Sequence, residues 1–118
     1  MKQSLTKLHG KEHVIIVALG DSNTELTWHT AGRLNWVGLL QYALFEKHGP
    51  NTATIINSGR CGDTAVESLT RLERDVIRFN PDLVIVSYGM NDAAQGQDGL
   101  AAYSDAIRKI VSRLGFVA

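Results

Sequence analysis

The sequence predicts an α/β protein, a three-layer α/β/α sandwich built on a parallel sheet. Three short apolar runs, residues 14–19, 52–57 and 83–86, alternate with longer segments of helical periodicity. The first and third runs are rich in β-branched residues and lack polar alternation, which is typical of strands covered on both faces. Strands that alternate with helices favour right-handed crossovers, and hence a parallel sheet between two helical layers.

Three helices are expected between and after these strands. The first is predicted over residues 31–48, where apolar residues follow helical spacing until a Gly-Pro pair stops it. The second is predicted over residues 64–79, because Thr64 and Glu67 have the spacing of a capping box and an Asn-Pro pair follows. The third is predicted over residues 98–114, with a glycine at the C-cap position.

The 118 residues predict a single domain, 1–118, because a second domain would leave neither part with enough chain for a core. Residues 1–12 are interpreted as a polar leader. At the other end, residues 116–118 are typical of the start of a fourth buried strand. We therefore expect the N-terminal part of a longer fold, truncated after the third helix; a naturally short domain with a frayed tail is the alternative.

Composition argues against several classes of function. The formal net charge is +0, which favours neither nucleic acid nor an anionic membrane as a partner, and no apolar run approaches the roughly 20 residues of a membrane span. Cys61 is the single cysteine, so an internal disulfide and a cysteine-rich zinc site are excluded. A reducing cytosol fits this cysteine usage, and no signal peptide is visible. Localisation stays open, with the cytoplasm slightly favoured.

Polar clusters follow each predicted strand, at residues 20–24, 57–64 and 88–92. Ligands of open α/β sheets bind at the carboxyl ends of the strands, so we expect these clusters to meet in one site. Ser22, in a tight turn after the first strand, is the candidate nucleophile of an acyl-transfer reaction. Each cluster taken alone is more typical of an ordinary turn than of a site; their order at three strand ends reverses this preference.

Three hydrogen-bond donors could surround a developing oxyanion. They are the backbone N–H groups of Ser22 and Gly59 and the side-chain amide of Asn91. Preorganised donors of this kind contribute about 3–4 kcal/mol each to transition-state stabilisation. Asp21 and Asp92 are interpreted as residues that fix loops rather than as metal ligands.

The three blocks resemble those of the SGNH hydrolases, also called GDSL esterases and lipases. The family's first block is matched by Gly20-Asp21-Ser22-Asn23. Its second block supplies a glycine, matched by Gly59, and its third block is matched by Gly89-Met90-Asn91-Asp92. The resemblance implies a flavodoxin-like fold with strand order 2-1-3-4-5, a Ser22 acyl-enzyme and an oxyanion hole from Ser22, Gly59 and Asn91. It implies a small-molecule ester as substrate and no cofactor.

One departure from the family pattern concerns the catalytic base. The family's last block, Asp-x-x-His, is absent, and the four histidines, His9, His13, His29 and His48, all precede the second strand. Only His29 follows Ser22 closely enough to be considered as a base. We therefore expect the isolated chain to be a poor hydrolase. The alternative is a non-catalytic ester- or glycan-binding pseudoenzyme of the same fold.

The third strand would be central in the full family fold. Its outer edge would therefore lack a neighbour here, and an unpaired edge of buried type invites pairing with another chain. The sequence accordingly predicts a homo-dimer, or aggregation, through the exposed sheet edge.

Overall fold

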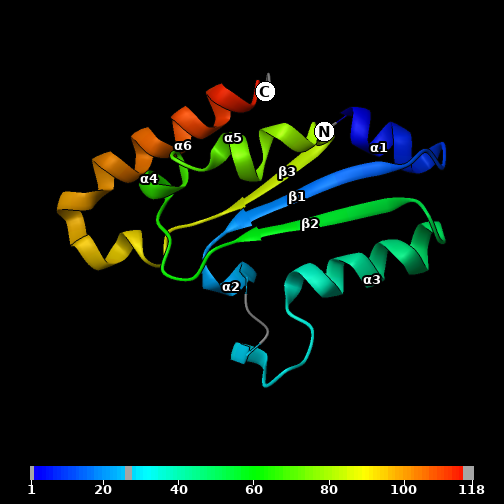
Figure 1. Ribbon diagram of the computed structural model, residues 1–118, viewed down its shortest axis with the longest axis horizontal. Helices are drawn as coiled ribbons and strands as arrows, with labels where there is room; N and C mark the ends of the chain where they lie inside the picture. The colour runs from blue at the N-terminus through cyan, green and yellow to red at the C-terminus, as the bar shows by residue number, and fades with distance from the viewer. Residues whose placement is uncertain (1, 26–27, 116–118) are drawn as a thin grey trace.

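The computed structural model describes residues 2–25 and 28–115, and it confirms the predicted α/β architecture. Three parallel strands, β1 (Val14–Gly20), β2 (Ala53–Gly59) and β3 (Leu83–Ser87), form a sheet in the order β2-β1-β3. In the strand register Gly20 pairs with both Gly59 and Ser87. All three strands therefore end at the same level, and the loops that follow them share one edge of the sheet (Figure 1).

Helices cover both faces of the sheet, as the apolar strands predict. On one face, Val17 and Leu19 pack beneath α4 (Ala65–Ser68), α5 (Leu72–Asp75) and α6 (Leu100–Leu114). On the other face, Val14 and Ile16 pack against α1 (Lys2–His9) and α3 (Trp36–His48). Figure 1 shows α4, α5 and α6 on the side of the sheet opposite α3.

The predicted helix over residues 64–79 is wrong as a continuous element. It consists of α4, α5 and a 3-10 turn, Ile77–Phe79, and the backbone leaves helical geometry at Arg71 (φ −119°, ψ 6°) and Val76 (φ −133°, ψ −63°). The capping role of Thr64 is confirmed, because its hydroxyl accepts a hydrogen bond of 3.1 Å from the Glu67 N–H. Both Arg71 and Val76 are buried, so tertiary contacts at these positions override the helical pattern.

The first predicted helix starts later than expected. Ala31 and the glycine that follows it have positive φ angles of 53° and 81°, which a right-handed helix excludes. The helix α3 begins at Trp36, where the Asn35 side chain accepts hydrogen bonds from the N–H groups of Val37 and Gly38 at 3.1 and 3.3 Å. Asn35 is therefore the N-cap, and residues 31–35 form the loop that leads into it.

The segment interpreted as a polar leader contains the helix α1. Leu8 of this helix is buried against the sheet, and Lys7 forms an ion pair with Asp82 just before β3. The third predicted helix begins two residues later than expected, after a 3-10 segment, Asp92–Gly99. Residues 116–118, the predicted start of a fourth strand, lie outside the described residues.

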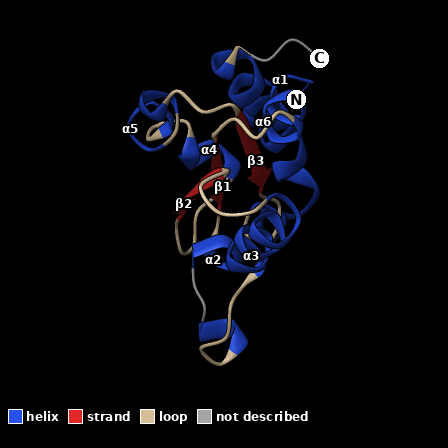
Figure 2. Ribbon diagram, turned by 90° about the vertical axis from the view of Figure 1, so that its right-hand side faces the viewer, coloured by secondary structure: helices blue, strands red, loops and turns tan. Residues whose placement is uncertain are grey.

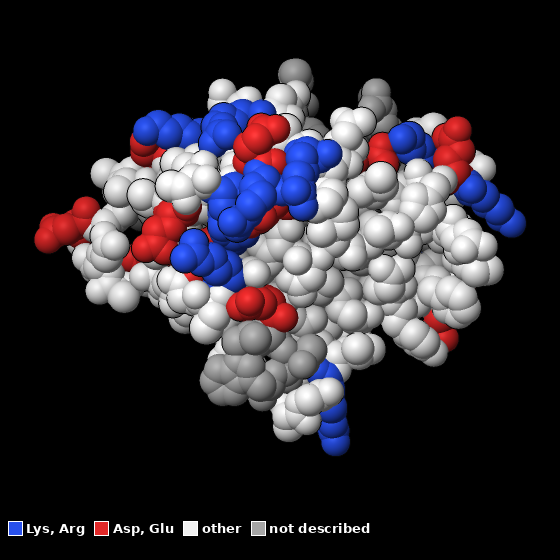
Figure 3. All heavy atoms as spheres, in the orientation of Figure 1, with Lys and Arg blue, Asp and Glu red and all other residues white. Residues whose placement is uncertain are grey.

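No helix in the described part of the chain combines the length and apolar character that a membrane crossing requires. Basic and acidic side chains are interspersed in the region of α4 to α6 (Figure 3), in keeping with the net charge of +0.

Candidate active site

Ser22 is the first residue of a short helix, α2 (Ser22–Glu25), that starts at the end of the central strand. The preceding residue, Asp21, is 3% exposed, and its Oδ1 accepts a hydrogen bond of 3.0 Å from the Asn23 N–H. Its carbonyl accepts hydrogen bonds from the N–H groups of Thr24 and Glu25. Asp21 is therefore the N-cap of α2, as its expected loop-fixing role requires. Within residues 2–25 and 28–115, neither the Ser22 hydroxyl nor its N–H has a hydrogen-bond partner.

Two glycines let α2 lie directly on the ends of the strands. A Cβ atom added at Gly20 would lie 2.3 Å from Thr24 Oγ1 and 2.8 Å from the carbonyl oxygen of Ser87. A Cβ atom added at Gly59 would lie 2.3 Å from the backbone nitrogen of Glu25. Real Cβ atoms do not approach other atoms this closely, so both positions require glycine for packing.

Two asparagines from different segments hold the carbonyl of Thr24. Asn35 donates to it through Nδ2 at 2.6 Å, and Asn57 donates to it through Nδ2 at 2.8 Å. Together they fix the last turn of α2, and so the orientation of the Ser22 backbone. Sequence reasoning missed both roles, although Asn57 stands in one of the predicted polar clusters.

The third block is attached to the second through two adjacent residues. Asn91 Nδ2 donates a hydrogen bond of 2.8 Å to the carbonyl oxygen of Asp63. The Asp92 carboxylate is 8% exposed and accepts hydrogen bonds of 3.1 and 3.3 Å from the Ala65 N–H. Asp92 thus satisfies a free N–H in the first turn of α4 and fixes a loop, as expected. Within the part of the chain that the structure describes, the second Nδ2 hydrogen of Asn91 has no hydrogen-bond partner.

The predicted oxyanion donor Gly59 is already engaged. Its N–H donates a hydrogen bond of 2.9 Å to Asn57 Oδ1, and its α-carbon faces the backbone of α2. Gly62, three residues later, has a φ of +77°, and a Cβ atom added there would have no heavy atom within 4 Å. Within the described residues the Gly62 N–H has no hydrogen-bond partner. The second block therefore offers two glycines, of which Gly62 has the open N–H.

A buried ionic network lies beneath these loops. Arg71, 5% exposed, pairs with Asp63, 1% exposed, at 2.8 Å, and Tyr88 donates a hydrogen bond of 2.6 Å to the same carboxylate oxygen. Burial and the hydrogen bond to Asp63 together raise the pKa of Tyr88, so the phenol stays neutral. Burial alone would lower the pKa of Arg71, but its hydrogen bonds to Asp63 and Asp75 raise it. Sequence reasoning missed this network, because its contacts join residues that are far apart in the chain.

Among the described residues, no histidine forms a hydrogen bond with Ser22. The rings of His9 and His48 lie 6.3 Å apart, and His13 bonds Asn51 and Thr54 at the start of the strands. The seven residues of β1 separate that end of the sheet from Ser22 by roughly 20 Å. His29 belongs to a 3-10 turn, Trp28–Thr30, that projects from the body of the fold (Figures 1 and 2).

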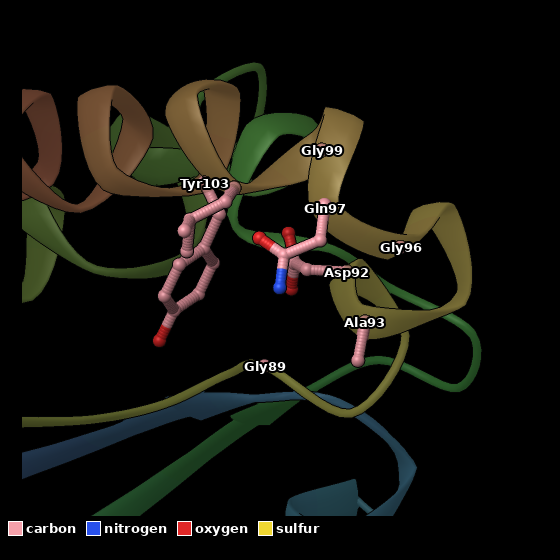
Figure 4. A pocket seen from close by; sticks show the side chains of 8 residues that line it. Gly89, Asp92, Ala93, Gly96, Gln97, Gly99 and Tyr103 are labelled. Atoms are coloured by element: carbon pink, nitrogen blue, oxygen red, sulfur yellow. The ribbon is translucent and has the colours of Figure 1, made fainter.

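A pocket of about 460 Å³ adjoins the third block. Figure 4 shows the side chains of Tyr103 and Gln97 projecting toward the loop that carries Gly89, with Asp92 beside Gln97. The lining of the pocket is mostly apolar and includes small residues that leave room for a ligand. Among the described residues, no cluster of three or more His, Cys, Asp or Glu could hold a metal ion.

Comparison with known proteins identifies the family. Residues 18–116 match the GDSL-like lipase/acylhydrolase family, and the chain therefore belongs to this family. An arylesterase of Vibrio mimicus is 36% identical over 81 residues, which are 69% of this chain and 39% of that protein.

Solved structures agree in fold. A lipase/acylhydrolase from Enterococcus faecalis matches with 28% identity and a TM-score of 0.68, over 86% of this chain and 52% of that chain. An acetyl xylan esterase from Geobacillus stearothermophilus matches with 22% identity and a TM-score of 0.71, over 85% of this chain and 54% of that chain. The present chain thus spans about half the length, or less, of these relatives.

Proposed function

We propose that this chain carries the nucleophile and the oxyanion hole of a serine hydrolase that cleaves small-molecule carboxylic esters. The observation that supports this most directly is the position of Ser22. It opens a helix at the end of the central strand, and its hydroxyl and N–H have no partner among the described residues. Asn91, fixed to the neighbouring loop through Asp63, supplies the second polar group of the site.

The proposed reaction proceeds through an acyl-enzyme. Ser22 Oγ attacks the ester carbonyl carbon and loses its proton to a base, and the carbonyl oxygen becomes an oxyanion. Collapse of the tetrahedral intermediate expels the alcohol, which takes up the proton, and leaves the acyl group on Ser22. Water then attacks the acyl-enzyme by the same steps and releases the carboxylic acid.

The Ser22 N–H and the second Asn91 Nδ2 hydrogen are the proposed oxyanion donors from the first and third blocks. Gly59 was the predicted donor from the second block, but its N–H would first have to leave Asn57 Oδ1. Gly62 presents its N–H without such a competitor. We therefore favour Gly62 over Gly59 for this role. Binding of a boronic acid that forms a tetrahedral adduct should shift the Gly62 amide resonance more than that of Gly59.

The proposed base lies in the Asp-x-x-His block that characterises the family. Three of the four histidines in this chain lie at the opposite end of the sheet, and His29 stands on a projecting turn. A serine triad without its base keeps only the catalysis that binding and the oxyanion hole provide. The 118 residues alone are therefore expected to hydrolyse esters poorly.

The relatives fit an ester as substrate. Their names describe an arylesterase, a lipase/acylhydrolase and an acetyl xylan esterase, which all cleave carboxylic esters. We propose the same reaction, hydrolysis of a carboxylic ester, for the present protein. The acyl and alcohol groups of the ester are left open.

The decisive test compares the whole protein with its Ser22→Ala variant on p-nitrophenyl acetate. We expect the variant to lose a factor of about 10³ or more in kcat, and the wild type to form a Ser22 adduct with a fluorophosphonate, detected by mass spectrometry. Full activity in Ser22→Ala would contradict the proposal. Ester or glycan binding that Ser22→Ala leaves unchanged, with no turnover by any form, would instead favour the pseudoenzyme.

A further inference from the structure

One buried guanidinium contacts the ends of β1 and β2 and the side chain of the residue that follows β3. Arg71 donates hydrogen bonds to the carbonyl of Gly20, the last residue of β1, at 3.3 Å, and to the carbonyl of Ser58 in β2 at 3.0 Å. It also donates to the hydroxyl of Tyr88, the residue directly after β3, at 2.9 Å. Each of the three polar loops thus starts beside the same side chain.

The guanidinium also reaches the side-chain amide of the third block through Asp63. Arg71 Nε and Nη2 both bond Asp63 Oδ2, at 3.1 and 2.8 Å, and Tyr88 bonds the same oxygen at 2.6 Å. The backbone carbonyl of that aspartate accepts the hydrogen bond from Asn91 Nδ2. A shift of Asp63 would therefore move the partner that orients Asn91.

The chemistry of this cluster requires arginine rather than any cation. Arg71 contacts two carbonyls, one hydroxyl and two carboxylates, those of Asp63 and Asp75, through all three of its nitrogens. A guanidinium supplies five N–H donors in a fixed plane, whereas a lysine ammonium supplies three from one point. A buried ion pair is also a poor source of stability compared with apolar packing, so stability alone does not account for it.

We infer that Arg71 is the positioning residue of the oxyanion hole: it fixes the Ser22 N–H relative to the Asn91 amide by holding Gly20, Asp63 and Tyr88 together. This inference rests on the proposed ester hydrolase function. Arg71 does not contact substrate; it acts through the groups that do. Its loss should therefore reduce transition-state stabilisation more than substrate binding.

The kinetic test uses p-nitrophenyl acetate and the whole protein. We expect Arg71→Lys to lower kcat by about 10- to 100-fold with KM within about twofold, and to weaken inhibition by a boronic acid in step with kcat. Tyr88→Phe, which removes only one hydroxyl, should lower kcat by about fivefold. Arg74→Lys is the matched control, because the Arg74 side chain is 69% exposed and, among the described residues, forms an ion pair with Asp75 alone. It should leave kcat within about twofold.

The structural test does not depend on activity. In Arg71→Lys the side-chain amide resonances of Asn91 should shift, whereas in Arg74→Lys they should stay in place. A folded Arg71→Lys variant with unchanged kcat, or with a raised KM as its only defect, would overturn the inference. If Arg71→Lys does not fold, the inference is tested instead on Tyr88→Phe, by its kcat and KM and by the side-chain amide resonances of Asn91. A wild-type protein without esterase activity would refute the proposed function, while a shift of the Asn91 resonances would still support the positioning role.

Discussion

Gly59 lies against the backbone of Glu25 so closely that a Cβ atom at Gly59 would fall 2.3 Å from the Glu25 nitrogen and 2.7 Å from its Cα. The second strand end and the helix that starts at Ser22 are therefore in direct backbone contact. This contact explains the glycine by packing, which is why we propose Gly62, in the more open part of the second block, as the oxyanion donor.

We expect Gly59→Ala to destabilise the fold by about 3 kcal/mol, because backbone atoms cannot yield as a side chain would. Gly62→Ala should cost only about 1 kcal/mol, from the left-handed backbone, since the space around Gly62 is open. Urea unfolding of both variants measures the difference. Equal losses of stability would show that the contact with Glu25 is not what requires glycine at position 59.

The two asparagines on the Thr24 carbonyl predict partial redundancy. Removal of one, in Asn57→Ala, leaves the bond from Asn35 but also frees the Gly59 N–H that donates to Asn57 Oδ1, so it should cost about 2 kcal/mol. Removal of both leaves the carbonyl unpaired and should cost more than the sum of the single variants. Asn35→Ala alone also removes the N-cap of α3. The test is therefore the coupling energy of the double-mutant cycle, which urea unfolding of the wild type, both single variants and the double variant measures. Strict additivity would mean that the two bonds are independent.

The sequence predicted the elements whose patterns are local and missed the contacts that are not. The three strands and the Thr64 cap were predicted because apolar runs and capping residues act within a few positions. The breaks near Arg71 and Val76 were missed, since only the tertiary network makes a buried arginine at position 71 favourable. Ser22 and Asn91 were assigned to one site because they follow strand ends, and their roles there stay predictions. The packing role of Gly59 depends on Glu25, 34 positions earlier in the chain, which no local pattern reveals.

Acid should weaken the network through Asp75. Its hydrogen bond from Arg74, followed by that from Arg71, lowers the pKa of Asp75 from 3.8 to about 2. Because the folded-state pKa lies below the unfolded value, the contribution is complete above about pH 4 and is lost as the pH falls toward 2. We expect Asp75→Asn to flatten the fall of the unfolding free energy over this range. Asp105→Asn, which breaks only an exposed pair with Lys109, is the control and should keep the wild-type slope.

The unpaired edge of β3 predicts association of the 118-residue chain. Among the described residues β3 pairs only with β1, and its four apolar residues, 83–86, are only partly buried. A second chain that pairs with this edge would satisfy its free backbone groups. Sedimentation over a range of concentrations should therefore reveal dimers or larger species. A monodisperse monomer at high concentration would contradict this expectation.

High pH should lower the free energy of unfolding through Tyr88. Its folded-state pKa is raised above the ordinary value of 10.0 by burial and by the hydrogen bond to Asp63. Below pH 10 the phenol is neutral in both states; above it the unfolded chain loses the proton while the folded chain keeps it, so stability falls as the pH rises. Tyr88→Phe should be less stable at neutral pH but should lose less on going from pH 9 to pH 11. Urea unfolding at the two pH values, and at neutral pH, measures these changes in the free energy of unfolding. If Tyr88→Phe kept the wild-type pH dependence, Tyr88 would ionise as freely in the folded protein as in the unfolded chain.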